Sequence, residues 1–231
     1  MRQVVLDTET TGLEIDKGHR IIEIGAVELI NRRAHREWHC YLNPEREIDT
    51  EALAVHGLDL TFLGSKPKFH DIVDEMIDFI LGSELIMHNA AFDVAFLNAE
   101  LGRLGKGNLE EFCTVFDTLK LARELHPGQR NNLDALCKRY GVDNSKRDKH
   151  GALMDAQLLA EVYLAMTRGQ ESLLDHEQNT SAEFVAEIAK PGNLEILYAT
   201  PEEEESHRKL LEQIAKKAKK GCLWLEITNH P

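Results

Sequence analysis

The sequence predicts an α/β domain with a mixed central sheet of about five strands flanked by helices. Three consecutive strand-like segments open the chain, and strand-like segments then alternate with helical ones. This order is typical of a sheet that combines antiparallel and parallel neighbours. The chain has 231 residues, of which 42% are hydrophobic and 29% are charged. That length and composition predict one sizeable globular domain with an appendage.

Short apolar or alternating runs predict the strands. They cover residues 2–7, 21–30, 35–42, 84–88 and 113–118. The second run is apolar enough to lie centrally in the sheet, and the polar residues after it predict a hairpin connection. The third carries Trp38 and Tyr41 among polar residues, which indicates an antiparallel edge strand.

Apolar periodicity and end signals predict the helices of the same domain. They cover residues 50–55, 69–81, 90–103, 118–125, 132–140 and 151–168. Asp49 or Thr50 is the expected cap of the first helix, and Asn89 is the expected cap of the third.

The character of the chain changes after the last of these helices. Residues 175–193 are rich in Glu, Asn, Thr and Ser and show little periodicity, which predicts a linker. Order returns with a strand-like run at 194–199 and a helix that begins at Thr200 and Pro201. With Trp224, this segment carries more apolar surface than its size can bury alone. The predicted units are residues 1–169, 170–193 and 194–231.

Charge and cysteine usage narrow the class of protein. With 27 basic and 40 acidic residues the formal net charge is −13, which argues against a broad basic face for duplex DNA. It does not exclude a nuclease with local, metal-mediated contacts. No apolar run approaches about 18 residues, so no membrane span is expected. The start of the sequence has no signal-peptide pattern, and four scattered cysteines predict reduced thiols in a cytoplasmic protein.

Two carboxylates, Asp7 and Glu9, stand where the first strand ends, before Gly12. Residues i and i+2 of a strand share one face, so both carboxylates can point at the same spot. Like charges held together raise each other's pKa, and a divalent metal is the natural compensating cation. On its own, however, an Asp-x-Glu triplet is more often a solvated strand end.

Two further carboxylates and one histidine are expected near this strand end. Asp93 lies one turn into a helix that follows a strand, although the helix dipole alone would favour an acid there. Asp155 lies on the apolar side of its helix, where an unpaired carboxylate is costly and a ligand or cation is expected. His150 precedes that helix after a basic stretch, and a lone loop histidine is usually only a surface residue.

Taken together, Asp7, Glu9, Asp93, His150 and Asp155 resemble the DEDDh family of 3′→5′ exonucleases. The matching segments are DTETTG from Asp7, HNAAFD from His88 and HGALMD from His150. Each motif is weak alone, and three in order are strong. Within the family, the sequence is most similar to the proofreading subunits of bacterial replicative DNA polymerases. This likeness covers essentially the whole chain, including residues 51–57, 156–167 and 221–224.

The resemblance implies an RNase H-like exonuclease fold and a mechanism with two divalent metal ions, Mg²⁺ or Mn²⁺. It makes Asp7, Glu9 and Asp155 the main metal ligands, and these residues also contact the substrate. Asp93 completes the cluster through a direct or water-mediated contact. His150, whose ordinary pKa is about 6.5, would take the proton from the attacking water. Carboxylate oxygens suit Mg²⁺ and Mn²⁺ better than zinc, which prefers thiolates and several histidines.

The resemblance also places the substrate. Glu51 and His56 match positions that contact the 3′-terminal nucleotide, whereas His56 alone would suggest a residue that interacts with a helix end. Gly12 would allow a tight turn that brings the backbone close to that nucleotide. The terminus has to be unpaired, so mispaired ends, which melt more easily, would be preferred.

Three partners are implied in the same way. Gln170, Leu173 and Leu174 resemble the short peptide that binds the sliding clamp, with Leu174 in place of the usual aromatic residue. A frayed helix end is the alternative. Residues 194–231 resemble the tail that docks on the alpha subunit of the polymerase, with a small independent subdomain as the alternative. A small theta subunit on the exonuclease domain is permitted.

The predicted function is therefore metal-dependent removal of mispaired nucleotides from the 3′ end of DNA, as the proofreading subunit of a replicative polymerase. One alternative is a stand-alone exonuclease that trims RNA or short oligonucleotides, which would not need the linker and tail. The other is an inactive structural adaptor, which would not need four converging carboxylates.

Overall fold

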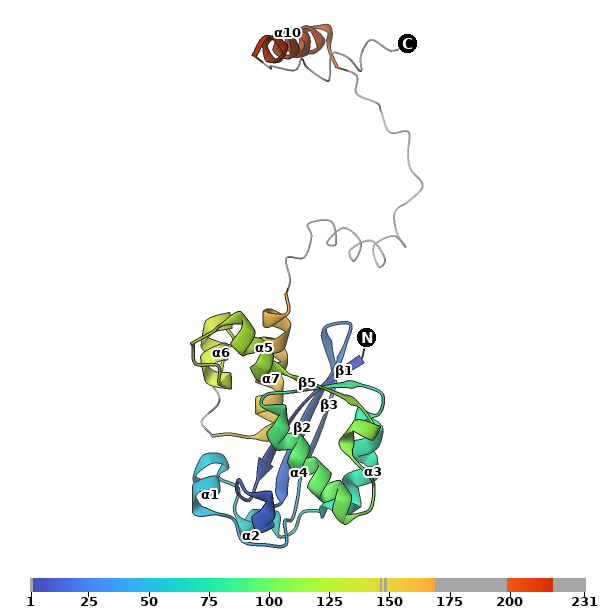
Figure 1. Cartoon of the computed structure of the whole chain (residues 1–231), viewed down its shortest axis with the longest axis vertical. Helices are drawn as coiled ribbons and strands as arrows, with labels where there is room; N and C mark the ends of the chain where they lie inside the picture. The colour runs from blue at the N-terminus through green and yellow to red at the C-terminus, as the bar shows by residue number, and fades with distance from the viewer. Residues whose placement is uncertain (1, 146, 148, 169–198, 218–231) are drawn as a thin grey trace. The chain divides into compact units, whose positions relative to one another are not determined.

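A five-stranded sheet forms the centre of the first of the two units into which the chain divides, Met1–Gln170 and Glu171–Pro231. The structure, a computed structural model, describes residues 2–145, 147, 149–168 and 199–217. The strand order is β3-β2-β1-β4-β5 (Figure 1). The strands are β1 Arg2–Thr10, β2 Ile21–Ile30, β3 Arg33–Tyr41, β4 Glu84–Met87 and β5 Thr114–Asp117.

The sheet is mixed, as predicted. β1 and β2 are antiparallel, as are β2 and β3, whereas β4 is parallel to both β1 and β5. Asn31 and Arg32 connect β2 to β3 with positive φ angles, the backbone that a two-residue hairpin turn requires. β3 is the antiparallel edge strand, and β1 is the middle strand, with β2 beside it.

Helices cover both sides of this sheet. They are α1 Thr50–His56, α2 Leu60–Leu63, α3 Phe69–Ile80, α4 Ala90–Arg103, α5 Thr118–Leu125, α6 Leu133–Tyr140 and α7 Ala152–Met166, with short 3₁₀ turns η1 Ile15–Lys17 and η2 Leu109–Glu111. The six predicted helices are present, with ends that differ by two residues at most. α2, η1 and η2 were not predicted, because elements this short carry no readable periodicity.

Alternate side chains of β1 enter two separate hydrophobic cores. Val4 and Leu6 pack in the core formed with α3 and α4, whereas Val5 packs in the core formed with α6 and α7. Figure 1 shows α3 and α4 together on one side and α5, α6 and α7 gathered on the other. The two-residue period of the strand therefore assigns Asp7 and Glu9 to the α7 side and Thr8 to the α4 side.

β1 is longer than the sequence predicted. The prediction ended the strand at Asp7, but β2 continues to pair with it, with Asp7 opposite Gly25 and Glu9 opposite Glu23. The register changes only between Glu9 and Thr10. Both carboxylates therefore lie on regular strand backbone, whose hydrogen bonds fix them in position relative to β2 and α7.

Gly25 allows α7 to approach the sheet. A Cβ atom at this position would lie 2.2 Å from the Leu153 backbone nitrogen and 2.3 Å from the Ala152 carbonyl carbon. These are main-chain atoms in the first turn of α7, so no side-chain rearrangement could accommodate the extra carbon. Since Gly25 pairs with Asp7, the close approach brings the start of α7 beside the carboxylates of β1.

Gly25→Ala is expected to destabilise the protein by about 1 to 3 kcal/mol, because the added methyl group forces α7 away from β2. Urea unfolding followed by circular dichroism measures the change. Gly102→Ala in α4 is the matched control, because a Cβ atom there meets nothing within 4 Å. Equal stability of the Gly25→Ala protein and the wild type would show that the packing of α7 is looser than described.

The second unit contains the helix α10, Pro201–Lys217. Its predicted start is confirmed, since the Glu203 side chain accepts from the Thr200 nitrogen at 2.8 Å and the Glu203 nitrogen donates to Thr200 Oγ1 at 3.3 Å. The predicted linker at 175–193, the strand at 194–199 except for its last residue, and Trp224 lie outside the described residues.

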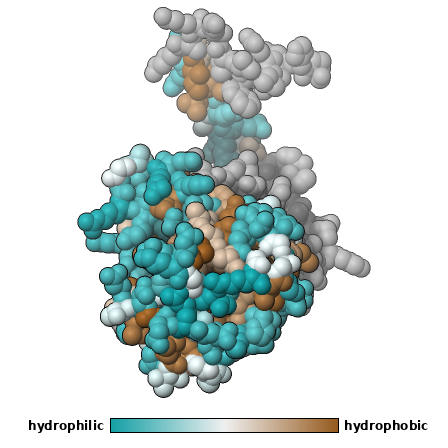
Figure 2. Space-filling view, turned by 60° about the horizontal axis from the view of Figure 1, so that its bottom comes forward, coloured by the Kyte–Doolittle hydropathy of each residue, from teal (hydrophilic) through white to brown (hydrophobic). Residues whose placement is uncertain are grey.

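The face of the described chain that Figure 2 shows is mainly hydrophilic. Hydrophobic side chains form scattered patches on this face. Within the described ranges, no helix is long and apolar enough to cross a membrane. Among the described residues Cys40, Cys113 and Cys137 are free cysteines, and Cys113 and Cys137 are buried.

Candidate active site

The predicted metal ligands and His150 come together at the end of β1. Atoms of Glu9, His150 and Asp155 that can bind a metal all lie within 4.8 Å of one another. Asp7 and Asp93 line the same cavity, which we call the carboxylate cavity and which has a volume of about 420 Å³. Four carboxylates therefore meet at one place, although the three elements that carry them, β1, α4 and α7, are far apart in the sequence.

Asp93 reaches the cavity from the opposite side of the sheet. It is buried in the first turn of α4, and the Thr8 hydroxyl donates a hydrogen bond of 2.6 Å to its Oδ1. Burial raises the pKa of Asp93 to about 6, and the bond from Thr8 opposes that rise. Thr8 thus holds Asp93 in place, a role that its position between Asp7 and Glu9 did not suggest.

The expected capping role of the Asn89 side chain is wrong. Asn89 does stand at the N-cap of α4, but its φ is 66° and its side chain makes no capping hydrogen bond. Its backbone nitrogen instead donates to Asp117 Oδ1 at 3.2 Å. This left-handed backbone turns the chain sharply between β4 and α4, which is why the side chain does not point back along the helix.

Crowding perturbs the carboxylates of β1. Burial is the largest cause that raises the pKa of Asp7 well above its ordinary value, and the charges of Asp93, Asp155 and Glu9 add to it. Burial, followed by the charges of Asp155 and Glu23, raises the pKa of Glu9 to about 8. Both groups thus bind protons more tightly than ordinary carboxyl groups, and the same crowding favours a cation among them.

Arg147 is the site residue that sequence reasoning missed. Its Nε and Nη2 each donate a 2.6 Å hydrogen bond to one oxygen of Asp155, and its Nη1 donates to Asp134 at 2.6 Å. The guanidinium is 6% exposed. Asp155 is therefore paired. A buried carboxylate was expected to have a ligand or a cation as partner, and in this structure the partner is the guanidinium of Arg147. The only signal in the sequence was the basic stretch before His150.

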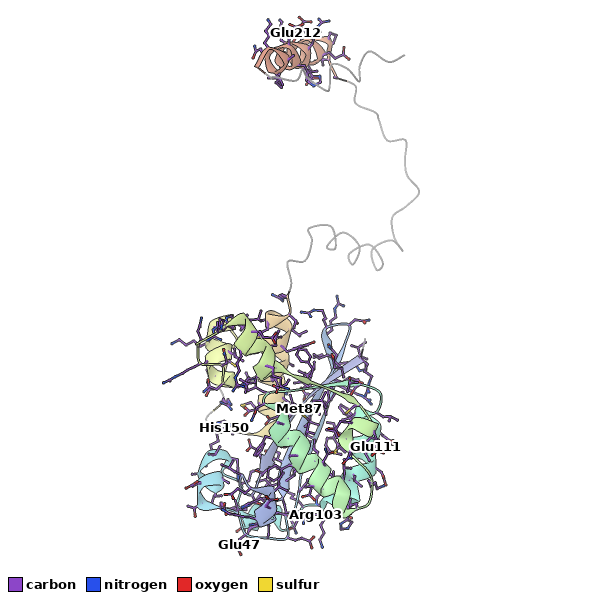
Figure 3. The ribbon with its side chains drawn as sticks, viewed as in Figure 1. Glu47, Met87, Arg103, Glu111, His150 and Glu212 are labelled. Carbon is purple, nitrogen blue, oxygen red and sulfur yellow. The ribbon has the colours of Figure 1, made fainter. Side chains whose placement is uncertain are left out.

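His150 stands at the mouth of the carboxylate cavity. Its side chain is 47% exposed, and its Nδ1 lies 3.2 Å from Asp155 Oδ2 and 2.8 Å from Arg147 Nη2. Its backbone nitrogen donates to the carbonyl of Val55 in α1. Figure 3 shows His150 in the segment that leads into α7. The imidazole is thus accessible to water and close to the carboxylates, which a proton acceptor requires.

Glu51 and His56 lie apart from the four carboxylates, in a neighbouring cavity of about 390 Å³ that we call the terminal cavity. The two cavities share Thr8, Glu9 and Phe92 as lining residues. A group bound against Glu51 and His56 would therefore contact the wall that carries Glu9.

His56 is a buried, neutral donor. Its Nδ1 accepts from the Leu58 nitrogen at 3.0 Å, which places the proton on Nε2. Among the described residues Nε2 makes no hydrogen bond of normal geometry, and the backbone of Thr10 is the polar group that interacts with the ring. Burial is the largest of the effects that lower the pKa of His56. A buried N–H without a hydrogen bond of normal geometry is costly, so this nitrogen is suited to a ligand.

Gly12 also lines the terminal cavity, and its neighbours give a further reason for a glycine there. A Cβ atom would lie 2.4 Å from the imidazole of His19 and 2.7 Å from a carboxylate oxygen of Asp49. Close packing against these two side chains therefore excludes a larger residue. The backbone here does not adopt the positive φ that favours glycine.

Comparisons with known proteins agree with this geometry. The family model described as "Exonuclease" matches residues 4–163. The chain belongs to the exonuclease family. It is 49% identical to DNA polymerase III subunit epsilon of Salmonella typhimurium over 96% of this chain and 97% of that protein. The corresponding subunit of Escherichia coli is 48% identical, with the same coverage. The chain therefore falls among the epsilon subunits.

Solved structures support the same fold. Exonuclease X in complex with 5′ overhanging duplex DNA has a TM-score of 0.57 and 27% identity, covering 71% of this chain and 90% of that one. Escherichia coli exonuclease I in complex with a dT13 oligonucleotide has a TM-score of 0.63 and 16% identity, covering 82% and 46%. The RNase H-like exonuclease fold predicted from the sequence is confirmed.

The donor set fits divalent metal ions. Carboxylate oxygens and one imidazole within 4.8 Å of one another are hard ligands of the kind that Mg²⁺ and Mn²⁺ accept. Nucleases of the DEDDh type depend on metal, and this chain carries their acidic cluster. The predicted clamp residues Gln170, Leu173 and Leu174 lie outside the described residues.

In the absence of metal, Glu9→Gln is expected to become more stable relative to the wild type as the pH rises from 5 to 8. The pKa of Glu9 is about 8 when the protein is folded, and the ordinary value of a glutamate is 4.5. Between these values only the folded protein holds the proton, so the wild type loses about 1.4 kcal/mol per pH unit through this group.

Thermal unfolding in EDTA at several pH values measures the effect. Glu47→Gln is the control, because Glu47 is exposed and does not line the carboxylate cavity. If the Glu9→Gln protein and the wild type lose stability with pH at the same rate, Glu9 is not the crowded carboxyl group described above.

Proposed function

We propose that this protein is the proofreading epsilon subunit of DNA polymerase III, a 3′→5′ exonuclease that removes mispaired nucleotides from the 3′ end of DNA. One observation carries the proposal: the carboxylate cavity, with Glu9, Asp155 and His150 together, shares a wall with the terminal cavity, which holds Glu51 and His56. The epsilon relatives, matched over 96% of this chain, support it.

The proposed cofactors are two divalent ions, Mg²⁺ or Mn²⁺, held chiefly by Asp7, Glu9 and Asp155, with Asp93 completing the set directly or through water. When bound, such ions supply positive charge that acidifies the attacking water and stabilises the leaving 3′ oxygen. Thr8 keeps Asp93 oriented through its 2.6 Å hydrogen bond. Arg147 fixes both oxygens of Asp155 through two hydrogen bonds of the same length.

His150 is the proposed general base. Its exposed ring can take the proton of the attacking water at the nitrogen that does not face Asp155. Arg147 lies against the same ring, with its Nη2 2.8 Å from His150 Nδ1, and helps to hold the imidazole in position. The hydrogen bond from the His150 backbone nitrogen to the carbonyl of Val55 connects this residue to α1, the helix that carries Glu51 and His56.

The terminal cavity is the proposed site of the 3′-terminal nucleotide. His56 Nε2 is a donor for the sugar or base, and Glu51 is an acceptor for a hydroxyl group. Asp7, Glu9 and Asp155 would hold the ions beside the scissile phosphate and so form the part of the site that receives it. A nucleotide reaches this cavity only when it is unpaired, and a mispaired terminus frays at lower cost than a matched one.

Purified protein with Mn²⁺ or Mg²⁺ is expected to release 5′-mononucleotides from the 3′ end of single-stranded DNA. It should degrade a mismatched primer terminus faster than a matched one, and DNA faster than RNA of the same sequence. Gel analysis of 5′-labelled substrates measures all three comparisons. Equal rates on RNA would favour a stand-alone nuclease, and no activity would favour a structural adaptor.

Two variants test the roles within this assay. Asp7→Asn is expected to lose at least about 100-fold in rate together with Mn²⁺ affinity, because a ligand is lost. His150→Ala is expected to lose about 10²- to 10⁴-fold in kcat with little change in Mn²⁺ affinity measured by calorimetry. A parallel loss of both in the His150 variant would make this residue a metal ligand.

We also propose that residues 194–231 bind the alpha subunit and that residues 170–174, with Gln170, Leu173 and Leu174, bind the sliding clamp. A theta subunit on residues 1–169 would be a third partner, and the cytoplasm is the expected location. Deleting residues 194–231 should abolish co-purification with the alpha subunit and spare the nuclease. A truncated protein that still co-purifies would place the contact elsewhere.

A further inference from the structure

The cavities of this face continue past the carboxylates. A third cavity of about 640 Å³, which we call the exit cavity, is formed by the end of β4, by α5 and by residues 128–132. His88, Asn89 and Asn132 line both the exit cavity and the carboxylate cavity. The function proposed above gives it no role.

The three cavities lie in sequence along the protein. The terminal cavity adjoins the carboxylate cavity at Thr8, Glu9 and Phe92, and the exit cavity adjoins it through different residues. The carboxylate cavity therefore lies between the other two. A strand with its last nucleotide in the terminal cavity and its scissile phosphate at the carboxylates has the exit cavity as its continuation in the 5′ direction.

The exit cavity differs from the two neighbouring cavities in the charge of its lining residues. Carboxylates line the terminal and carboxylate cavities, but among the described residues none lines the exit cavity. The nearby carboxylate of Asp117 is already engaged, because its Oδ1 accepts from the backbone nitrogens of Leu119 and Asn89. In a chain of net charge −13, a lining without carboxylates lowers the electrostatic cost of binding a phosphate at this place.

Arg123 supplies a matching cation. It lies in the last turn of α5 and lines the exit cavity, and its side chain is exposed. It forms no ion pair within the described part of the chain, unlike Arg147 or Arg20, whose guanidinium groups bond carboxylates. A guanidinium that is free of carboxylates is suited to bidentate bonds with a phosphodiester.

Neutral donors complete the lining. Asn132 Oδ1 accepts from the Ala135 nitrogen at 3.0 Å, which leaves its amide nitrogen as a donor. Gln129 lines the cavity and is exposed. Burial is the main cause that lowers the pKa of His88, whose ring is held by a 2.9 Å bond to Thr118. One arginine among neutral amides suits a singly charged phosphodiester better than a dianion.

We propose that the exit cavity binds a single nucleic-acid strand on the 5′ side of the scissile phosphate, with Arg123 bonded to the next phosphodiester. This proposal rests on the proposed function, because that function assigns the other two cavities. It makes Arg123 a substrate-binding residue with no part in the hydrolysis itself.

The test compares substrates of two lengths in Mn²⁺ with the full chain. The p-nitrophenyl ester of thymidine 5′-monophosphate fills only the terminal and carboxylate cavities, whereas a thymidine tetranucleotide also reaches the exit cavity. In Arg123→Gln, the kcat/KM for the tetranucleotide relative to that for the ester is expected to fall about tenfold. The dependence of log kcat/KM on log salt concentration should become shallower by about 0.7.

Arg33→Gln is the matched control, because Arg33 is an exposed arginine at the start of β3 and lines none of the three cavities. It should leave the ratio and the salt dependence as in the wild type. An unchanged ratio in Arg123→Gln would overturn the proposal. So would a loss of equal size on both substrates, because Arg123 would then act on the metal centre or on the fold.

A binding measurement separates this proposal from the proposed function. Fluorescence anisotropy of a 5′-labelled thymidine tetranucleotide in Ca²⁺ should show about tenfold weaker binding for Arg123→Gln than for the wild type. If the wild type hydrolyses neither substrate, the proposed function fails while this comparison still decides about the cavity. Equal binding of the tetranucleotide by both proteins would refute the proposal that the exit cavity binds the strand through Arg123.

Discussion

Negative charge buried at the end of β1 is the constraint on which the rest of the site depends. Taking a carboxylate out of water costs several kcal/mol unless a cation or a proton compensates it. Both occur here: Arg147 bonds both oxygens of Asp155, and burial with neighbouring charge raises the pKa of Asp7 and of Glu9, which favours their protonated forms. Divalent cations would take the place of the protons and of the arginine. The crowding of the carboxylates, which destabilises the protein without metal, therefore favours metal binding.

Backbone packing produces this crowding. Gly25 lets α7 lie directly on β2, and its pairing with Asp7 places the first turn of α7, with Asp155, beside that carboxylate. On the opposite face of the sheet, Thr8 binds Asp93. The carboxylates are thus held by a strand register, a helix contact and one hydrogen bond. Rigid elements of this kind keep ligands close together despite their mutual repulsion.

The parts that sequence predicted are those governed by periodicity. The two-residue period of β1 placed Asp7 and Glu9 on one face, and three motifs indicated which helices would bring the other acids. Arg147 could not be predicted, because its segment has no period and its bonds depend on how α6 and α7 pack. The left-handed backbone of Asn89 was also missed, since the sequence pattern there equally suits an ordinary N-cap.

The order of the cavities gives selectivity for mispaired ends a physical basis. If the strand occupies all three, at least two nucleotides have to leave the duplex before hydrolysis. Each base step contributes about 1.4 kcal/mol of stacking, so every step that has to melt lowers the reactive population by about tenfold. A mismatch has already lost the first step. The enzyme would then need no contact that recognises a wrong base, because the duplex itself makes the distinction.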